Sequence, residues 1–68
     1  MRVTINSELK DIEHVETLAA LLGLFGVSSE TRGVAVALNG EVVPKSAWAS
    51  ARVREGDAVE VIHAVQGG

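Results

Sequence analysis

The first residues of the chain alternate between apolar and polar side chains. Val3 and Ile5 fall on one side of an extended backbone and their polar neighbours on the other, which is the period-two pattern of a half-buried strand. The alternation predicts a strand over residues 1–6. Residues 9–14 are rich in charge and poor in apolar side chains, and such a composition predicts a solvated edge strand.

The apolar spacing becomes helical from residue 15 onwards. Thr17 is a suitable N-cap, and Gly26 stands just beyond the last apolar position, where helices commonly end in glycine. The pattern predicts a helix of roughly two to three turns, followed by a polar loop over residues 27–33. The apolar positions expected on its buried face are Val15, Leu18, Leu21, Leu22 and Phe25.

A hairpin follows the loop. Residues 34–38 form a nearly continuous apolar run, and residues 41–43 form a second, shorter one. Asn39 and Gly40 lie between the runs, and this pair favours a type I′ turn because both central positions of that turn need a positive φ. The pattern predicts two antiparallel strands joined by a two-residue turn.

The last third of the chain predicts one more strand. Residues 45–51 are compatible with a single helical turn around Trp48, residues 54–57 with a turn, and residues 58–63 alternate cleanly between apolar and polar. The order of elements is therefore strand, strand, helix, strand, strand, strand. These elements predict an α+β domain in which the helix covers one face of the sheet.

The composition agrees with a single small domain over residues 1–68. The chain has 68 residues, 47% of them hydrophobic, and no cysteine, so one compact core must stabilise it without disulfides or thiolate metal sites. Val and Ile together outnumber Leu, a bias that favours strands.

Charge and hydropathy argue against two classes of partner. The net charge is −3, with one Phe, one Trp and no Tyr, so the chain offers neither a phosphate-binding surface nor a base-stacking platform, and no nucleic-acid partner is expected. The longest apolar stretch, residues 18–27, is far shorter than the ~20 residues that span a bilayer. The first residues turn polar too soon for a secretory signal. We therefore expect no membrane association and a cytoplasmic location, which the absence of cysteine also fits.

The side chains offer no self-contained active site. His14 and His63 are the only histidines, and without cysteine or a His-Glu-x-x-His spacing they predict no metal site. No phosphate-binding loop, dinucleotide fingerprint or nucleophile elbow is present, and the carboxylates are spread evenly along the chain. We expect no cofactor bound by this chain, ordinary surface histidines, and a Trp48 that caps the core instead of stacking on a ligand.

The last residues are the remaining candidates for chemistry. Gly67 and Gly68 lack a Cβ, so they form the slimmest backbone and could thread a narrow tunnel. Residues 64–68, taken as a flexible tail, would reach about 16 Å beyond the last strand when extended. That is far enough to bring a terminal carboxylate into the active site of another protein. From the residues alone, an inert loose end is an equally open interpretation.

The second half of the chain carries four distinctive segments, which are Asn39–Pro44, Trp48, Glu55–Val61 and Val65–Gly68. In their order and spacing they resemble the ThiS family, the sulfur carrier proteins of thiamine biosynthesis. The first half matches only as a pattern of elements. The resemblance covers essentially the whole chain and implies a ubiquitin-like β-grasp fold, in which a five-stranded mixed sheet curls around one main helix.

The resemblance also implies a function. In this family an E1-like adenylyltransferase of the ThiF type uses ATP and magnesium to adenylate the C-terminal carboxylate, here that of Gly68. Sulfur drawn from cysteine through a desulfurase then replaces AMP to give a thiocarboxylate, and a thiazole synthase of the ThiG type accepts this sulfur. The chain would thus be a carrier and not an enzyme. Gly68 would react, Gly67 would keep the approach narrow, and Gln66 and Val65 would contact the partners.

Other functions share this chemistry or this fold. The small subunit of molybdopterin synthase, or another thiocarboxylate carrier, would use the same Gly68 carboxylate for a different product. A ubiquitin-like covalent modifier would join Gly68 to lysines of other proteins, and a plain β-grasp interaction module would leave the tail inert. The ending Val65–Gly68 looks more like that of ThiS than like that of the molybdopterin synthase subunit.

Overall fold

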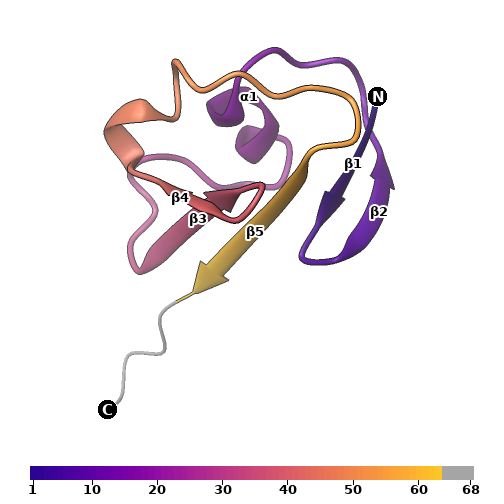
Figure 1. Cartoon of the computed structure of the whole chain (residues 1–68). Helices are drawn as coiled ribbons and strands as arrows, with labels where there is room; N and C mark the ends of the chain where they lie inside the picture. The colour runs from indigo at the N-terminus through magenta and orange to yellow at the C-terminus, as the bar shows by residue number, and fades with distance from the viewer. Residues whose placement is uncertain (64–68) are drawn as a thin grey trace.

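The computed structural model describes residues 1–63, and residues 64–68 lie outside the described part. The described residues form five strands, one α-helix and one short 3₁₀ helix (Figure 1). The element order predicted from the sequence is thereby confirmed. In chain order the elements are β1 (Arg2–Ile5), β2 (Glu8–Asp11), α1 (Leu18–Gly23), β3 (Val34–Leu38), β4 (Glu41–Val43), the 3₁₀ helix η1 (Lys45–Ala47) and β5 (Ala58–His63).

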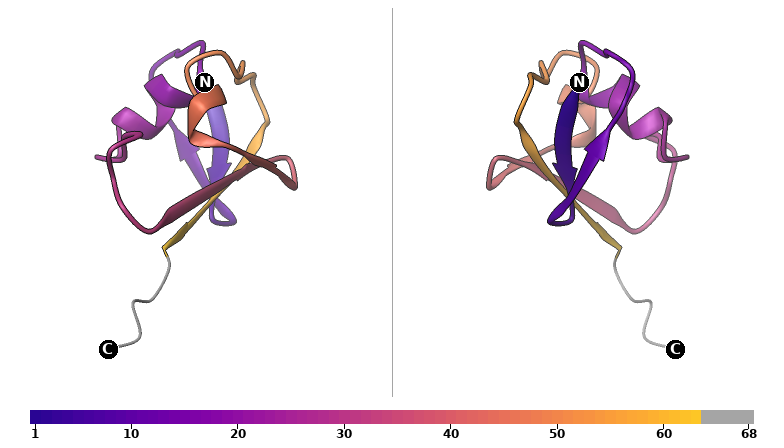
Figure 2. Two further views of the ribbon diagram at one scale, coloured as in Figure 1. Left: turned by 90° about the vertical axis from the view of Figure 1, so that its left-hand side faces the viewer. Right: turned by 90° about the vertical axis from the view of Figure 1, so that its right-hand side faces the viewer.

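The strands form one mixed sheet in the order β2-β1-β5-β3-β4. β5 lies at its centre, parallel to β1 and antiparallel to β3, while the hairpins β1-β2 and β3-β4 are antiparallel. The side views show the sheet curling around α1, which covers one of its faces (Figure 2). This arrangement is the ubiquitin-like β-grasp fold that the resemblance implied.

The helix α1 begins and ends through the two signals seen in the sequence. The Thr17 hydroxyl oxygen accepts a hydrogen bond from the amide of Ala20 at 3.1 Å, which caps the first turn. At the other end Gly26 takes a φ of +79°, and the amide of Val27 donates to the Leu22 carbonyl at 3.0 Å, as in a Schellman motif. No helix within residues 1–63 is long and apolar enough to cross a membrane.

Phe25 does not lie on the buried face of the helix, so this prediction was wrong. The last turn tightens, because the amide of Phe25 bonds to the carbonyl three residues back, that of Leu22, and such 3₁₀-type bonds shift side chains off the helical stripe. Phe25 is 43% exposed, whereas Val27, which was assigned to a polar loop, is buried. An apolar residue after a glycine C-cap commonly packs on the last helical turn, which accounts for Val27.

β2 is shorter than the strand predicted over residues 9–14. Asn6 and Ser7 form a two-residue turn with φ of +51° and +70°, so that the register starts with Ile5 opposite Glu8 and runs out where β1 itself begins. β2 nevertheless lies at the edge of the sheet, as its charges predicted.

Trp48 is the largest member of an entirely apolar core among the described residues. Its indole Nε1 donates to the Val43 carbonyl at 2.9 Å, so the one polar atom of this side chain is satisfied. The chain reaches the position through η1, which follows Pro44. Trp48 thus belongs to the core, as predicted. The buried side chains are Val3, Leu18, Leu21, Leu22, Val27, Val36, Trp48, Val53 and Val59.

Replacing Trp48 by Phe should lower the free energy of unfolding by about 2 kcal/mol, because the smaller ring leaves a cavity and loses the hydrogen bond to Val43. Urea unfolding followed by circular dichroism measures this change. Val42→Ala is the control, since Val42 is 68% exposed, and it should change the free energy by less than about 0.5 kcal/mol. Equal losses in the two variants would contradict the burial of Trp48.

Candidate functional site

β5 carries the chain to the candidate site, because residues 64–68 follow directly after it. On one side β5 pairs with β3 over five positions, the last of which joins His63 to Val34. On the other side it pairs with β1 at only two positions, the last of which joins Val59 to Ile5. Because the pairing with β3 continues to His63, the sheet sets the place where the tail starts.

The start of β5 is held by a polar clamp around Asn39. The Asn39 Oδ1 accepts the amide of Ala58 at 2.9 Å, and its Nδ2 donates to Asp57 Oδ1 at 3.1 Å. The other carboxylate oxygen of Asp57 accepts the amide of Arg54 at 2.8 Å. Asn39 and Gly40 have φ of +51° and +85°, which confirms the type I′ turn. Asn39 therefore forms the β3-β4 turn with Gly40, and its side chain connects this turn to the turn that precedes β5.

The middle of β5 is held on the β1 side by a second asparagine, Asn6. Its amide donates to the Val59 carbonyl at 2.9 Å, and its side-chain Oδ1 accepts the Val61 amide at 2.8 Å. The Asn6 side-chain oxygen thereby accepts the hydrogen bond that a backbone carbonyl would accept if β1 continued past Ile5. The backbone instead turns at Asn6 and Ser7, which both have a positive φ. Asn6 thus extends the β1-β5 ladder by two hydrogen bonds beyond Ile5, the last paired residue of β1, one from its backbone amide and one to its side chain.

The residues assigned to chemistry from the sequence, which are Gly68, Gly67, Gln66 and Val65, lie outside the described residues, and their roles stay predictions. Figure 1 shows where their segment starts, at the end of β5 and away from the N-terminus. His14 and His63 are exposed, as predicted. Within residues 1–63 no three His, Asp or Glu side chains come together as a metal-binding group.

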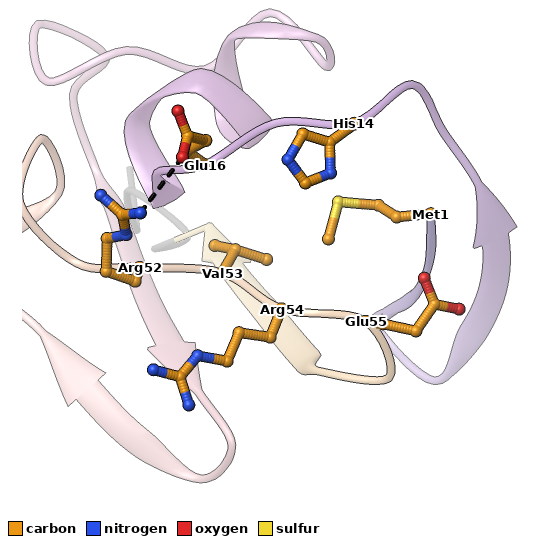
Figure 3. Close-up of a pocket in the computed structure, with 7 residues that line it drawn as sticks. All are labelled: Met1, His14, Glu16, Arg52, Val53, Arg54 and Glu55. Carbon is orange, nitrogen blue, oxygen red and sulfur yellow. Dashed lines mark hydrogen bonds and ion pairs between the residues drawn. The ribbon is translucent and has the colours of Figure 1, made fainter.

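A cavity of about 320 Å³ lies at the opposite end of the domain, beside the N-terminus (Figure 3). Two charged groups of its wall pair with each other, because Arg52 Nη2 lies 3.1 Å from Glu16 Oε1. A third, Glu55 Oε1, accepts the amide of Arg2 at 3.0 Å. The Arg54 side chain points away from the cavity. The cavity does not adjoin the end of β5, so we assign it no part in the candidate site.

The sheet face turned away from α1 carries a strip of apolar side chains, which we call the outer apolar strip. Side chains alternate between the two faces of each strand, so the neighbours of the buried Val36 and Val59 face outward. Val42 and Ile62 are the large members, 68% and 53% exposed, and the register sets each beside an alanine of β3. The strip consists of Ala35, Ala37, Val42, Ala58 and Ile62, and the charged Glu60, which is paired with Ala37, lies on the same face between Ala58 and Ile62.

Sequence reasoning missed the outer apolar strip. The signal was present in the sequence, because several positions that a half-buried strand normally fills with polar residues are apolar here. The strip ends beside the last residues of β5, since Ile62 immediately precedes the final described residue. We therefore treat the strip as a candidate interaction surface, because neighbouring exposed apolar side chains are typical of such surfaces.

Comparisons with known proteins agree with this geometry. A protein-family model described as the ThiS family matches residues 3–68. The crystal structure of a thiamine biosynthesis protein (ThiS) from Geobacter metallireducens has a TM-score of 0.82 and 33% identity, covering 100% of both chains. An NMR solution structure of a thiamine biosynthesis protein from the same organism has a TM-score of 0.79 and 33% identity, covering 100% of this chain and 88% of that one.

One relative is a longer protein. A protein named thiazole synthase from Paramagnetospirillum magneticum (strain ATCC 700264 / AMB-1) is 43% identical over 68 residues, which are 100% of this chain and 20% of the relative. The chain thus spans about a fifth of the length of this curated relative.

Replacing Asn6 by Gly should loosen the end of β5, because glycine keeps the positive φ but removes the oxygen that accepts the Val61 amide. We expect the free energy of unfolding to fall by about 1 kcal/mol and the Val61 amide to exchange with solvent roughly tenfold faster. Amide hydrogen exchange followed by NMR measures both. Ser7→Gly is the matched control, because Ser7 also has a positive φ. A Val61 exchange rate that is equal in the two variants would contradict the role of Asn6.

Proposed function

The chain belongs to the ThiS family, and we propose that it acts as the sulfur carrier of thiamine biosynthesis and not as an enzyme. The observation that carries this proposal is the family match, which runs from residue 3 to Gly68 and so includes the glycine pair at the end of this sequence. Similarity over the full length of a solved ThiS structure supports it. A domain of this kind needs no reaction cleft of its own, because its partners would supply the catalysis.

The proposed chemistry takes place at the carboxylate of Gly68. A carboxylate is a poor acyl donor because its leaving group would be oxide, so it must first be activated. Attack of a Gly68 carboxylate oxygen on the α-phosphorus of ATP forms an acyl-adenylate and releases pyrophosphate. A persulfide sulfur then displaces AMP, and cleavage of the remaining S–S bond by a thiol leaves a C-terminal thiocarboxylate. Sulfur thus travels on carbon, and the carrier needs no cysteine of its own.

The proposed partners follow from these steps. An E1-like adenylyltransferase of the ThiF type would bind ATP and magnesium and activate Gly68, while a cysteine desulfurase would supply the sulfur indirectly. A thiazole synthase of the ThiG type would accept the sulfur. The relative that is named thiazole synthase supports this last partner, because a stretch similar to the whole of this chain makes up a fifth of it.

The described part of the domain supports delivery of the tail to such partners. Asn39 holds the first residue of β5 and Asn6 holds Val59 and Val61, while pairing with β3 continues to His63, so the tail would start from a defined place and direction. Gly67 would keep the last segment slim enough for a tunnel, with Gln66 and Val65 contacting its walls. The outer apolar strip lies next to the end of β5 and would dock the partner while the tail enters.

Intact mass spectrometry of the chain purified from its native cells tests the function. We expect a fraction heavier by the difference between a sulfur and an oxygen atom, with the added mass mapped to the peptide that contains Gly68. A chain extended by one residue after Gly68 is the control, because it has no free Gly68 carboxylate, and it should carry no added mass and transfer no sulfur.

Three other results would overturn the proposal. Sulfur transfer by the extended chain would rule out the Gly68 mechanism. Gly68 found joined to lysines of other proteins would instead support a covalent modifier. Rescue of a molybdenum-cofactor auxotroph, without rescue of a thiamine auxotroph, would assign the same chemistry to molybdopterin synthase.

Gly67→Val should block adenylation, because a branched side chain next to Gly68 would clash with the walls of a narrow tunnel. We expect kcat/KM for ATP–pyrophosphate exchange with the activating enzyme to fall by about a hundredfold or more, with no change in thermal unfolding. Gly23→Val is the matched control, since no atom lies within 4 Å of a Cβ built on Gly23, and it should be adenylated normally. Normal adenylation of Gly67→Val would show that the tail does not enter a tunnel.

A further inference from the structure

The two edges of β5 differ in how far their backbone groups are paired. The amides and carbonyls of successive residues in a strand point alternately to its two neighbours. The Val59 carbonyl and the Val61 amide both bond to Asn6, so the odd-numbered residues of β5 face β1. The even-numbered residues face β3, as the 2.7 Å hydrogen bond from the Asn39 amide to the Ala58 carbonyl shows.

β1 ends before β5 does. Its last paired residue, Ile5, lies opposite Val59, and the chain then turns away at Asn6, whose side chain satisfies the Val61 amide. The Val61 carbonyl and the amide and carbonyl of His63 face the side that β1 has left. Within residues 1–63 these three groups have no hydrogen-bond partner. We call them the open edge of β5.

The position of the open edge sets it apart from an ordinary strand edge. Unpaired strand edges tend to pair with other chains, and natural proteins keep them short or cover them. Here the open edge belongs to the central strand, and among the described residues it is left unpaired because β1 stops early. It also leads directly into residues 64–68, so whatever pairs with it would align the segment that follows.

We propose that an extended segment of the enzyme that takes up the tail pairs with the open edge of β5, in the place that β1 leaves. This inference rests on the proposed function, because it assumes that the tail enters an enzyme. Strand addition provides main-chain hydrogen bonds that do not depend on side-chain identity. It also sets a distance, because Gly68 would lie about 16 Å beyond His63 if the pairing continued along the tail at strand spacing.

The surroundings of the open edge favour an enzyme over a second copy of this chain. Two copies joined here would share only the few groups of the open edge and would bring together two chains of net charge −3. An enzyme segment would instead continue along residues 64–68. Its enzyme would also cover the outer apolar strip, whose member Ile62 stands next to His63 on the same strand.

His63→Pro tests the pairing, because proline removes the one amide of the open edge. Although His63 lies opposite Val34 in the register, its amide points toward β1 and donates no hydrogen bond to β3. A strand tolerates proline at a position whose amide makes no hydrogen bond within the sheet. We expect the melting temperature to stay within a few degrees of the wild type. In ATP–pyrophosphate exchange, the KM of His63→Pro as the carrier should be at least about ten times the KM of His63→Ala, because alanine keeps the amide. Ile62→Pro should lower the melting temperature strongly, since the Ile62 amide faces β3.

Hydrogen exchange of the His63 amide tests directly whether an enzyme segment pairs with the open edge of β5. In the free chain it should exchange rapidly, and in the complex with the activating enzyme it should slow by about a hundredfold. Fast exchange in a complex that adenylates the wild type would overturn strand addition and leave the proposed function intact. Protection that grows with the concentration of the free chain would assign the edge to a second copy instead. If no such enzyme accepts the wild type, the proposed function fails, and strand addition fails with it.

Discussion

The pairing of β5 between β1 and β3 is the interaction on which the rest of the structure depends. It joins the first strand of the chain to the last, with Thr4 opposite Ala58, and so links two hairpins that have no other strand contact. The inward side chains of these three strands, Val3, Val36 and Val59, are almost completely buried and form the floor on which α1 packs. Without this pairing neither hairpin could bury its apolar face, because a two-stranded hairpin is marginal on its own in water.

Local signals explain the part of the fold that could be predicted from the sequence. Thr17, Gly26 and the Asn39-Gly40 pair each determine a helix end or a turn through their own backbone chemistry, and all were confirmed. The burial of Val53 could not be predicted in the same way. Val53 was assigned to no element, yet its amide donates to the Glu16 carbonyl at 3.1 Å, and this contact joins segments that only the complete fold brings together.

The candidate site shows the same division between local and distant signals. The glycine pair could be read from the sequence because its meaning lies in the missing Cβ, whereas its proposed chemistry came from the family resemblance. The two asparagines that hold β5 could not be recognised as positioning residues. Asn6 bonds to a residue 55 positions away, and Asn39 to one 19 positions away, so only the register of the sheet reveals them. The outer apolar strip falls between these cases. The sequence shows which residues of β3, β4 and β5 share a face, but it does not show which of the two faces is exposed.

Under the proposed function, the chain must bind each partner well enough to deliver its tail and weakly enough to leave. The outer apolar strip suits this demand, because three of its members are alanines and only Val42 and Ile62 offer large side chains. Main-chain pairing at the open edge of β5 would add register without demanding particular side chains of the partner. On this proposal two enzymes with unrelated sequences can receive the same tail, because each needs only a strand in the right place and a narrow channel beyond it.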